Sequence, residues 1–119
     1  MSANILLIDD YEPTALTMKV ICEEKGFSFH HAQSAQDSIK IASDTVFDLI
    51  LVDINLPDKS GTDLAPQMRD LCPTAKIIGF TADKEAVEEN DAGAFDSLEQ
   101  KNLEVTFIED RLNSWLYNA

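Results

Sequence analysis

Short apolar runs alternate along the chain with segments whose apolar residues recur every three to four positions. Five of these runs have the length of a strand, at residues 5–8, 27–29, 49–52, 76–80 and 94–98. The first, third and fourth runs are almost wholly apolar, which is typical of strands buried on both faces of a parallel sheet. The pattern therefore predicts five strands, of which these three are buried on both faces.

Segments with helical periodicity lie after the strand-like runs. Residues 13–25 have proline near the first turn and Gly26 directly after them, which are start and stop signals of a helix. Ser34 and Asp37 resemble a capping box that opens a second helix. A fourth helix is expected at about residues 84–91, with a weak apolar stripe. The apolar stripes of the third and fifth helices are Leu64, Met68 and Leu71, and then Val105, Ile108, Leu112 and Leu116.

This order of elements indicates where the chain can carry chemistry. Strict alternation of strand and helix with short connections favours a parallel sheet that is covered by helices on both faces. Right-handed crossovers then bring the carboxyl ends of all strands to one edge, where open α/β sheets bind ligands at a topological switch point. We therefore predict a doubly wound α/β fold in one domain, residues 1–119, with its site at that edge.

Polar residues follow four of the predicted strands. In chain order they are Asp9, Asp10, Asp53, Thr81, Gln100 and Lys101. Three carboxylates that are brought together repel one another unless a cation neutralises them. A hard divalent ion with oxygen ligands, Mg²⁺ first, suits such a group.

Asp53 is the candidate nucleophile of this set. Aspartate is ionised at neutral pH, so it can attack phosphorus without a general base. Phosphoryl transfer asks mainly for positioning and for charge neutralisation, which a bound metal and a lysine can supply. Asp53, a lysine and a metal ion therefore make a coherent phosphoacceptor site, and the Thr81 hydroxyl could donate to a new phosphate.

Several short motifs occur together in a fixed order. They are Leu7-Ile8-Asp9-Asp10, Leu51-Val52-Asp53-Ile54-Asn55-Leu56-Pro57, Gly61, Phe80-Thr81-Ala82 and Asp91-Ala92-Gly93-Ala94. Each motif is weak by itself, but the set and its spacing are specific. Over essentially its whole length, the chain resembles the receiver domains of two-component response regulators.

The resemblance implies a fold and a role for each matching residue. The fold is the flavodoxin-like, five-stranded parallel sheet with strand order 2-1-3-4-5. Asp9, Asp10 and Asp53, together with the backbone carbonyl of Asn55, would hold Mg²⁺. Asp53 would accept the phosphoryl group, and Thr81 would be the switch hydroxyl that is drawn toward it.

The resemblance also implies partners. A histidine kinase or a histidine phosphotransfer protein would donate the phosphoryl group, and the fourth helix, fifth strand and fifth helix would form an output face for a downstream protein. The domain would be a switch that assists its own phosphorylation and dephosphorylation, and not a turnover enzyme. A free-standing regulator, a phosphorelay shuttle and a receiver from a hybrid kinase all remain open.

The segment after the fifth strand departs from the family's pattern. The family usually has Lys-Pro there, joined by a cis peptide, with an aromatic residue three positions before the lysine. Counting from Gly93 without a gap places Gln100 at the lysine position, whereas one inserted residue gives that position to Lys101, with Asn102 instead of proline. Neither alignment supplies the aromatic residue. We assign the cation to Lys101, because Gln100 can donate hydrogen bonds but cannot balance the charge of a phosphoryl group.

Composition and charge limit the other functions. Twenty-two acidic and nine basic residues give a formal charge of −13. Such a charge repels phosphate backbones and anionic lipid, so we expect no direct contact with nucleic acid or membrane. No stretch approaches the roughly 18 consecutive apolar residues of a membrane span. The first residues lack the basic segment and the cleavage site of a secretory signal, so we expect a cytoplasmic protein.

The histidines and cysteines carry no motif of their own. His30 and His31 lie at the end of the second predicted strand, without the partner spacing of metal or phosphohistidine chemistry, and we interpret them as structural polar residues. Cys22 and Cys72 fit neither a disulfide framework nor a zinc site, so we expect reduced thiols.

Three other functions compete with the phosphoacceptor. A degenerate receiver would keep the fold and bind partners without phosphorylation; the irregular segment after the fifth strand supports it, whereas the intact aspartates and Thr81 argue against it. A phosphatase with an aspartyl-phosphate intermediate would need a second aspartate where the chain has Asn55. A flavodoxin would need a phosphate-cradling loop after the first strand, where Asp9 and Asp10 would repel the phosphate.

Overall fold

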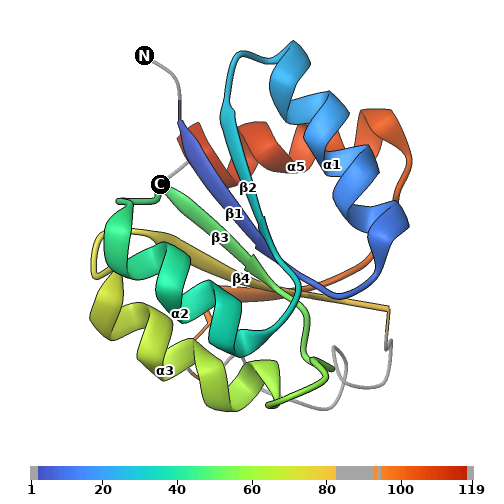
Figure 1. Cartoon of the computed structure of the whole chain (residues 1–119). Helices are drawn as coiled ribbons and strands as arrows, with labels where there is room; N and C mark the ends of the chain where they lie inside the picture. Colours follow the sequence, from blue (N-terminus) through green and yellow to red (C-terminus); the bar gives the residue numbers. More distant parts are fainter. Residues whose placement is uncertain (1–2, 83–92, 94, 118–119) are drawn as a thin grey trace.

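Five parallel strands form one sheet with the order β2-β1-β3-β4-β5 (Figure 1). The computed structural model describes residues 3–82, 93 and 95–117. The strands are β1 (Asn4–Ile8), β2 (Ser28–Ala32), β3 (Leu49–Val52), β4 (Lys76–Thr81) and β5 (Ser97–Gln100). The helices are α1 (Glu12–Glu24), α2 (Ala35–Asp44), α3 (Gly61–Leu71) and α5 (Val105–Tyr117). The predicted doubly wound sheet and its strand order are confirmed, and the fourth predicted helix, residues 84–91, lies outside the described residues.

Helices cover both faces of this sheet. Figure 1 shows α1 and α5 on one face and α2 and α3 on the other. Alternate residues of β1 enter different cores: Ile5 and Leu7 pack with α1 and α5, while Leu6 and Ile8 pack with α2 and α3. All four side chains are fully buried. The wholly apolar runs of the sequence therefore mark strands that are buried on both faces, as predicted.

Local signals account for the helix ends. Gly26, directly after α1, has a φ of 80°, a conformation that favours glycine. At the start of α2, the Ser34 side chain accepts a hydrogen bond of 3.1 Å from the Asp37 amide, which satisfies one of the free N–H groups of the first turn.

Two predicted strands have different bounds in the structure. The prediction started the fifth strand at residue 94, but β5 begins at Ser97. Phe95 is buried before β5 starts, and it packs beside Leu98 of β5 over Gly79, where an added side chain would collide with Leu98. The second strand was predicted to end at residue 29, but β2 extends to Ala32 and includes His31. β2 lies at the edge of the sheet and is half-buried, so it accommodates polar side chains that an apolar criterion excludes.

Both cysteines are free and buried, in agreement with the prediction. Burial raises the pKa of the Cys22 thiol to about 12. Within the described part of the chain, no helix has both the length and the apolar character that crossing a membrane requires.

Candidate functional site

Two aspartates extend neighbouring central strands by one residue. Ile8 of β1 is in register with Val52 of β3, so Asp9 and Asp53 leave the sheet side by side. The Asp53 amide donates to the Ile8 carbonyl over 2.9 Å, which carries the sheet hydrogen bonding beyond the strands. Asp9 is fully buried and Asp53 is 7% exposed, while Asp10 is exposed. One carboxylate oxygen from each of the three lies within 4.8 Å of the others.

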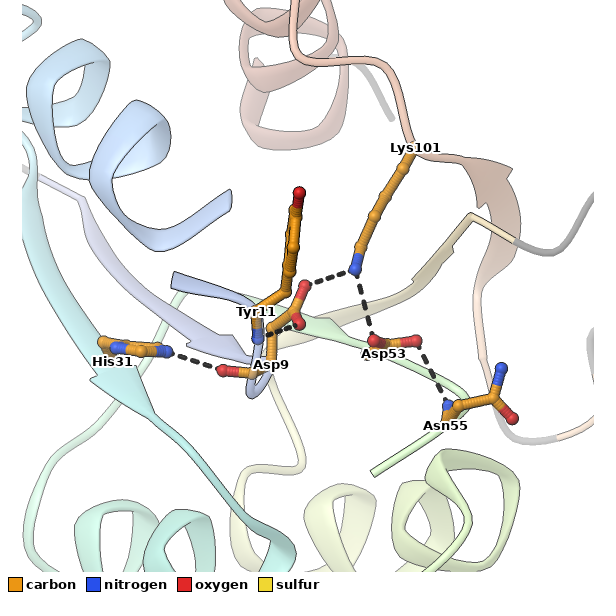
Figure 2. A network of polar contacts seen from close by, with 6 residues as sticks. All are labelled: Asp9, Tyr11, His31, Asp53, Asn55 and Lys101. Atoms are coloured by element: carbon orange, nitrogen blue, oxygen red, sulfur yellow. Dashed lines mark hydrogen bonds and ion pairs between the residues drawn. The ribbon is translucent and has the colours of Figure 1, made fainter. Parts of the chain in front are cut away.

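The Lys101 ammonium lies between two of these carboxylates (Figure 2). Its Nζ is 2.6 Å from Asp9 Oδ2 and 3.2 Å from Asp53 Oδ2. Thr81, which is buried at the end of β4, accepts a 2.7 Å hydrogen bond from the Lys101 amide through its carbonyl. Gln100, the other candidate for this position, is exposed. The peptide bond to Asn102 is trans, like every other described peptide bond.

Burial and the neighbouring opposite charges shift the pKa values of Asp9 and Lys101 in opposite directions. Burial raises the pKa of the Asp9 carboxyl, and it outweighs the Lys101 ammonium and the Tyr11 amide, which favour the charged form. Burial alone would lower the pKa of the Lys101 ammonium, but the carboxylates of Asp9 and Asp53 reverse this effect and raise it. Lys101 is therefore protonated at neutral pH.

The donor set fits a hard divalent cation. Among the described residues, the three clustered carboxylates have one ammonium beside them, which contacts Asp9 and Asp53, so two negative charges remain unbalanced when all three are ionised. Among the described residues, the buried Oδ2 of Asp9 has the Lys101 ammonium as its ion-pair partner but accepts no regular hydrogen bond. Carboxylate and carbonyl oxygens are the ligands that Mg²⁺ prefers in proteins.

The loop after β3 holds Asp53 through main-chain contacts. The Asn55 amide donates to Asp53 Oδ1 over 3.1 Å, and the Gly61 amide at the start of α3 donates to the Ile54 carbonyl over 2.7 Å. A side chain at Gly61 would collide with the Asp53 carbonyl. The helix can therefore approach the loop only because residue 61 is glycine.

Asp58 connects the same loop to α2. Its carboxylate accepts hydrogen bonds from the amides of Ala35, over 2.9 Å, and Gln36, over 3.0 Å. These bonds stabilise the charged form and lower the pKa of the Asp58 carboxyl. The N-terminus of α2 is thus capped by a residue from the loop that carries the candidate nucleophile.

Two contacts of the site were not predicted from the sequence. The Tyr11 amide donates to Asp9 Oδ1 over 2.9 Å, and its ring centroid lies 5.9 Å from the Lys101 ammonium. His31 Nε2 lies 2.6 Å from the Asp9 carbonyl oxygen. Nearness to Asp10 was the one sequence signal for Tyr11, and no spacing pattern pointed to His31.

The strand order and the acidic cluster at the carboxyl edge are those of a receiver domain. The chain belongs to the response regulator receiver domain family, whose sequence model matches residues 5–112.

The curated relatives are much longer than the chain. It is 34% identical over 98 residues to the alginate biosynthesis transcriptional regulatory protein AlgB of Pseudomonas aeruginosa, which covers 80% of the chain and 22% of that protein. It is 32% identical over 97 residues to the transcriptional regulatory protein SrrA of Staphylococcus aureus, which covers 82% of the chain and 39% of SrrA. The chain therefore spans only 22% and 39% of the lengths of these two relatives.

Solved structures of response regulators have the same fold. The response regulator TrrA of Thermotoga maritima, in complex with Mg²⁺ and BeF, aligns with a TM-score of 0.84 and 25% identity over 98% of this chain and 100% of that one. A Burkholderia pseudomallei response regulator with a phosphorylated aspartic acid and a calcium ion aligns with a TM-score of 0.82 and 27% identity, over 98% and 68% of the two chains.

Proposed function

We propose that Asp53 accepts a phosphoryl group in a Mg²⁺-dependent reaction, and that the domain signals by the resulting change of shape. Asp9, Asp10 and Asp53, with the carbonyl of Asn55, would hold the ion. The observation that carries the proposal is the Lys101 ammonium, within 3.2 Å of both Asp9 and Asp53. One ammonium does not balance three carboxylates, and a group of this charge is suited to a divalent ion and a phosphoryl group together.

The chain's own residues orient the nucleophile. The Asn55 amide holds Asp53 Oδ1 and the Lys101 ammonium holds Oδ2, so the carboxylate is fixed from two sides. In the reaction, an Asp53 oxygen forms the bond to phosphorus while the P–N bond of a phosphohistidine breaks, and its electron pair stays on the imidazole nitrogen. Lys101 balances part of the charge on the transferred group. Bound Mg²⁺ would supply further charge stabilisation at the phosphoryl oxygens.

The proposal also names the phosphoryl donor and the residues that would respond to phosphorylation. A histidine kinase or a histidine phosphotransfer protein carries the required phosphohistidine. Thr81 would read the new phosphate through its hydroxyl, and its carbonyl already bonds to the Lys101 amide, so both residues would respond together. The fourth helix, β5 and α5 would then present a changed surface to a downstream protein. The domain acts in this proposal as a switch and not as a turnover enzyme.

The test is to expose the protein to acetyl phosphate with and without Mg²⁺ and to measure intact mass. We expect one added phosphoryl group that requires Mg²⁺ and is lost in Asp53→Asn. Asp58→Asn is the matched control, because Asp58 lies in the same loop but caps α2. Thr81→Ala should still be phosphorylated, with smaller changes in the amide resonances of residues 97–112 than wild type.

One observation favours a second candidate, a degenerate receiver that binds partners without phosphorylation. Lys101 is followed by Asn102 through a trans peptide, where the family usually has a cis Lys-Pro bond. Wild-type protein that takes up no phosphoryl group, with Mg²⁺ and donor in excess, would favour this candidate over the phosphoacceptor.

A further inference from the structure

His31 contacts the main chain of the acidic cluster from the side opposite Lys101 (Figure 2). It is half-buried on β2, in register with Leu7 of β1, and its Nε2 lies 2.6 Å from the carbonyl oxygen of Asp9. A carbonyl oxygen can only accept, so Nε2 carries the proton and donates it. His31 therefore holds the backbone of Asp9 and not its carboxylate.

This hydrogen bond takes the place of one backbone hydrogen bond between β1 and β2. The Asp9 amide donates to the Ala32 carbonyl over 3.0 Å, and in a regular parallel ladder the next donor, to the Asp9 carbonyl, would be the amide of Ser34. Ser34 has already become the N-cap of α2. The imidazole of His31 supplies the N–H at the position where β2 turns away, so the buried carbonyl keeps a partner.

The bond also fixes the peptide plane between Asp9 and Asp10. The Asp9 side chain is held independently, by the Tyr11 amide and the Lys101 ammonium. Asp10 is exposed, and among the described residues no hydrogen bond or ion pair holds its carboxylate. Its position within 4.8 Å of the other two carboxylates therefore depends on the backbone that His31 fixes.

We propose that His31 is a positioning residue for magnesium binding, which holds the Asp9–Asp10 peptide so that the Asp10 carboxylate faces the ion. This inference rests on the proposed function, because it assumes that the three aspartates bind Mg²⁺. It assigns a role in the site to a strand at the edge of the sheet, on which no metal ligand lies.

The surroundings of His31 make the inference testable by substitution. The ring borders an open groove of about 330 Å³, whose other lining residues are Glu12, Ala15, Leu16, Lys19 and Phe29. A smaller side chain there leaves no closed cavity, so little stability should be lost. His30 is a matched control, since it is the neighbouring histidine on the same strand and its ring packs edge-on against Phe47, with 5.2 Å between ring centroids.

The experiment titrates Mg²⁺ alone into metal-free wild type, His31→Leu, His31→Gln and His30→Leu, by calorimetry and by amide NMR. Loss of an outer hydrogen bond to a metal site typically weakens affinity tenfold or more, so we expect a Kd about tenfold higher for His31→Leu. The amide resonance of Asp10 should shift in metal-free His31→Leu. His31→Gln, whose Nε2 can donate in place of the ring nitrogen, should recover most of the affinity and the resonance.

The control and the phosphorylation rate separate positioning from general damage. His30→Leu should bind Mg²⁺ like wild type, even if it unfolds more easily. At limiting Mg²⁺, His31→Leu should be phosphorylated by acetyl phosphate more slowly than wild type, whereas His30→Leu should match wild type. Equal Mg²⁺ affinity in wild type and His31→Leu would overturn this inference alone, whereas wild type that binds no Mg²⁺ would overturn the proposed function as well.

Discussion

The site has an acidic part, Asp9 and Asp53, and a basic part, Lys101, and the two parts follow strands of very different kinds. Asp9 and Asp53 follow β1 and β3, which lie between other strands and have almost no exposed surface. Lys101 follows β5, which is the edge strand beside β4 in the described sheet and is half-buried to exposed along its length. Asp53 and Asp9 are therefore held by core packing, whereas Lys101 is held mainly by charge.

The contacts of the two parts differ in the same way. Asp9 is fixed through its amide, its carbonyl and both carboxylate oxygens. Among the described residues, Lys101 has one main-chain hydrogen bond, to Thr81, and its ammonium faces the two carboxylates. This difference suits the proposed switch, because a phosphoryl group on Asp53 would compete for the ammonium and would move the end of β5 without disturbing the strands that carry the aspartates.

The largest effect on stability and on phosphorylation should come from replacing Lys101. Lys101→Met leaves the buried carboxylates without their ammonium, so the free energy of unfolding in EDTA should fall by about 3 kcal/mol. Mg²⁺ should restore part of this loss, because it binds the same carboxylates. The rate of phosphorylation by acetyl phosphate should fall about 100-fold. Urea unfolding with EDTA or Mg²⁺ and time-resolved intact mass measure these changes.

Lys25→Met is the control for this substitution. Lys25 pairs with Glu109 over 3.5 Å at the surface, where both side chains are about a third exposed. Such pairs contribute less than about 1 kcal/mol, and this one is not a contact of the site. Similar losses of stability in Lys25→Met and Lys101→Met would mean that the ion pairs with Asp9 and Asp53 do not hold Lys101 in place.

A smaller effect is expected when the acidic part is forced to move. In Gly61→Ala the new methyl group meets the Asp53 carbonyl, so the loop must shift and the fold should lose about 2 kcal/mol. Phosphorylation should slow as well, because the nucleophile is displaced. Gly26→Ala is the comparison: φ is 80° there and no atom lies within 4 Å of the added methyl group. Gly26→Ala should lower the free energy of unfolding by about 1 kcal/mol and leave the phosphorylation rate unchanged. If the phosphorylation rate also stayed unchanged in Gly61→Ala, the rigid placement of Asp53 would be contradicted.

The smallest effect concerns the start of β5. Asp96 accepts from Arg69 Nη2 over 2.9 Å and from the Ile77 amide over 2.8 Å. Burial opposes the charged form, but the Ile77 amide and Arg69 together outweigh it, and the pKa of the Asp96 carboxyl is lowered from its usual 3.8. A lowered pKa adds stability above the unfolded-state value, and that stability is lost as pH falls through the folded-state value.

Asp96→Asn should therefore be less stable than wild type at neutral pH, by less than about 1 kcal/mol, because the carboxylate is partly exposed and screened. The difference should shrink below about pH 4. Urea unfolding of both proteins at several pH values measures it. If the two proteins differ in free energy of unfolding by the same amount at neutral pH and near pH 2, the charge of Asp96 does not stabilise the start of β5.

The sequence by itself determined the fold class and the acidic part of the site. The apolar runs of β1, β3 and β4 are long enough and uniform enough to identify central strands, and an aspartate directly after such a strand can only lie at the carboxyl edge of the sheet. Asp9 and Asp53 therefore come together in any parallel sheet in which these strands are neighbours.

The tertiary structure decided the contacts whose partners are distant in the chain. The register of β5 pairs Leu98 with Gly79, so that the Leu98 side chain lies over the glycine, and this register decides that Lys101 and not Gln100 reaches the carboxylates. The bond from His31 to Asp9 depends on the pairing of β2 with β1. Hydrophobic periodicity reports which face of an element is buried, but it contains no information on the register between elements, and these contacts depend on register.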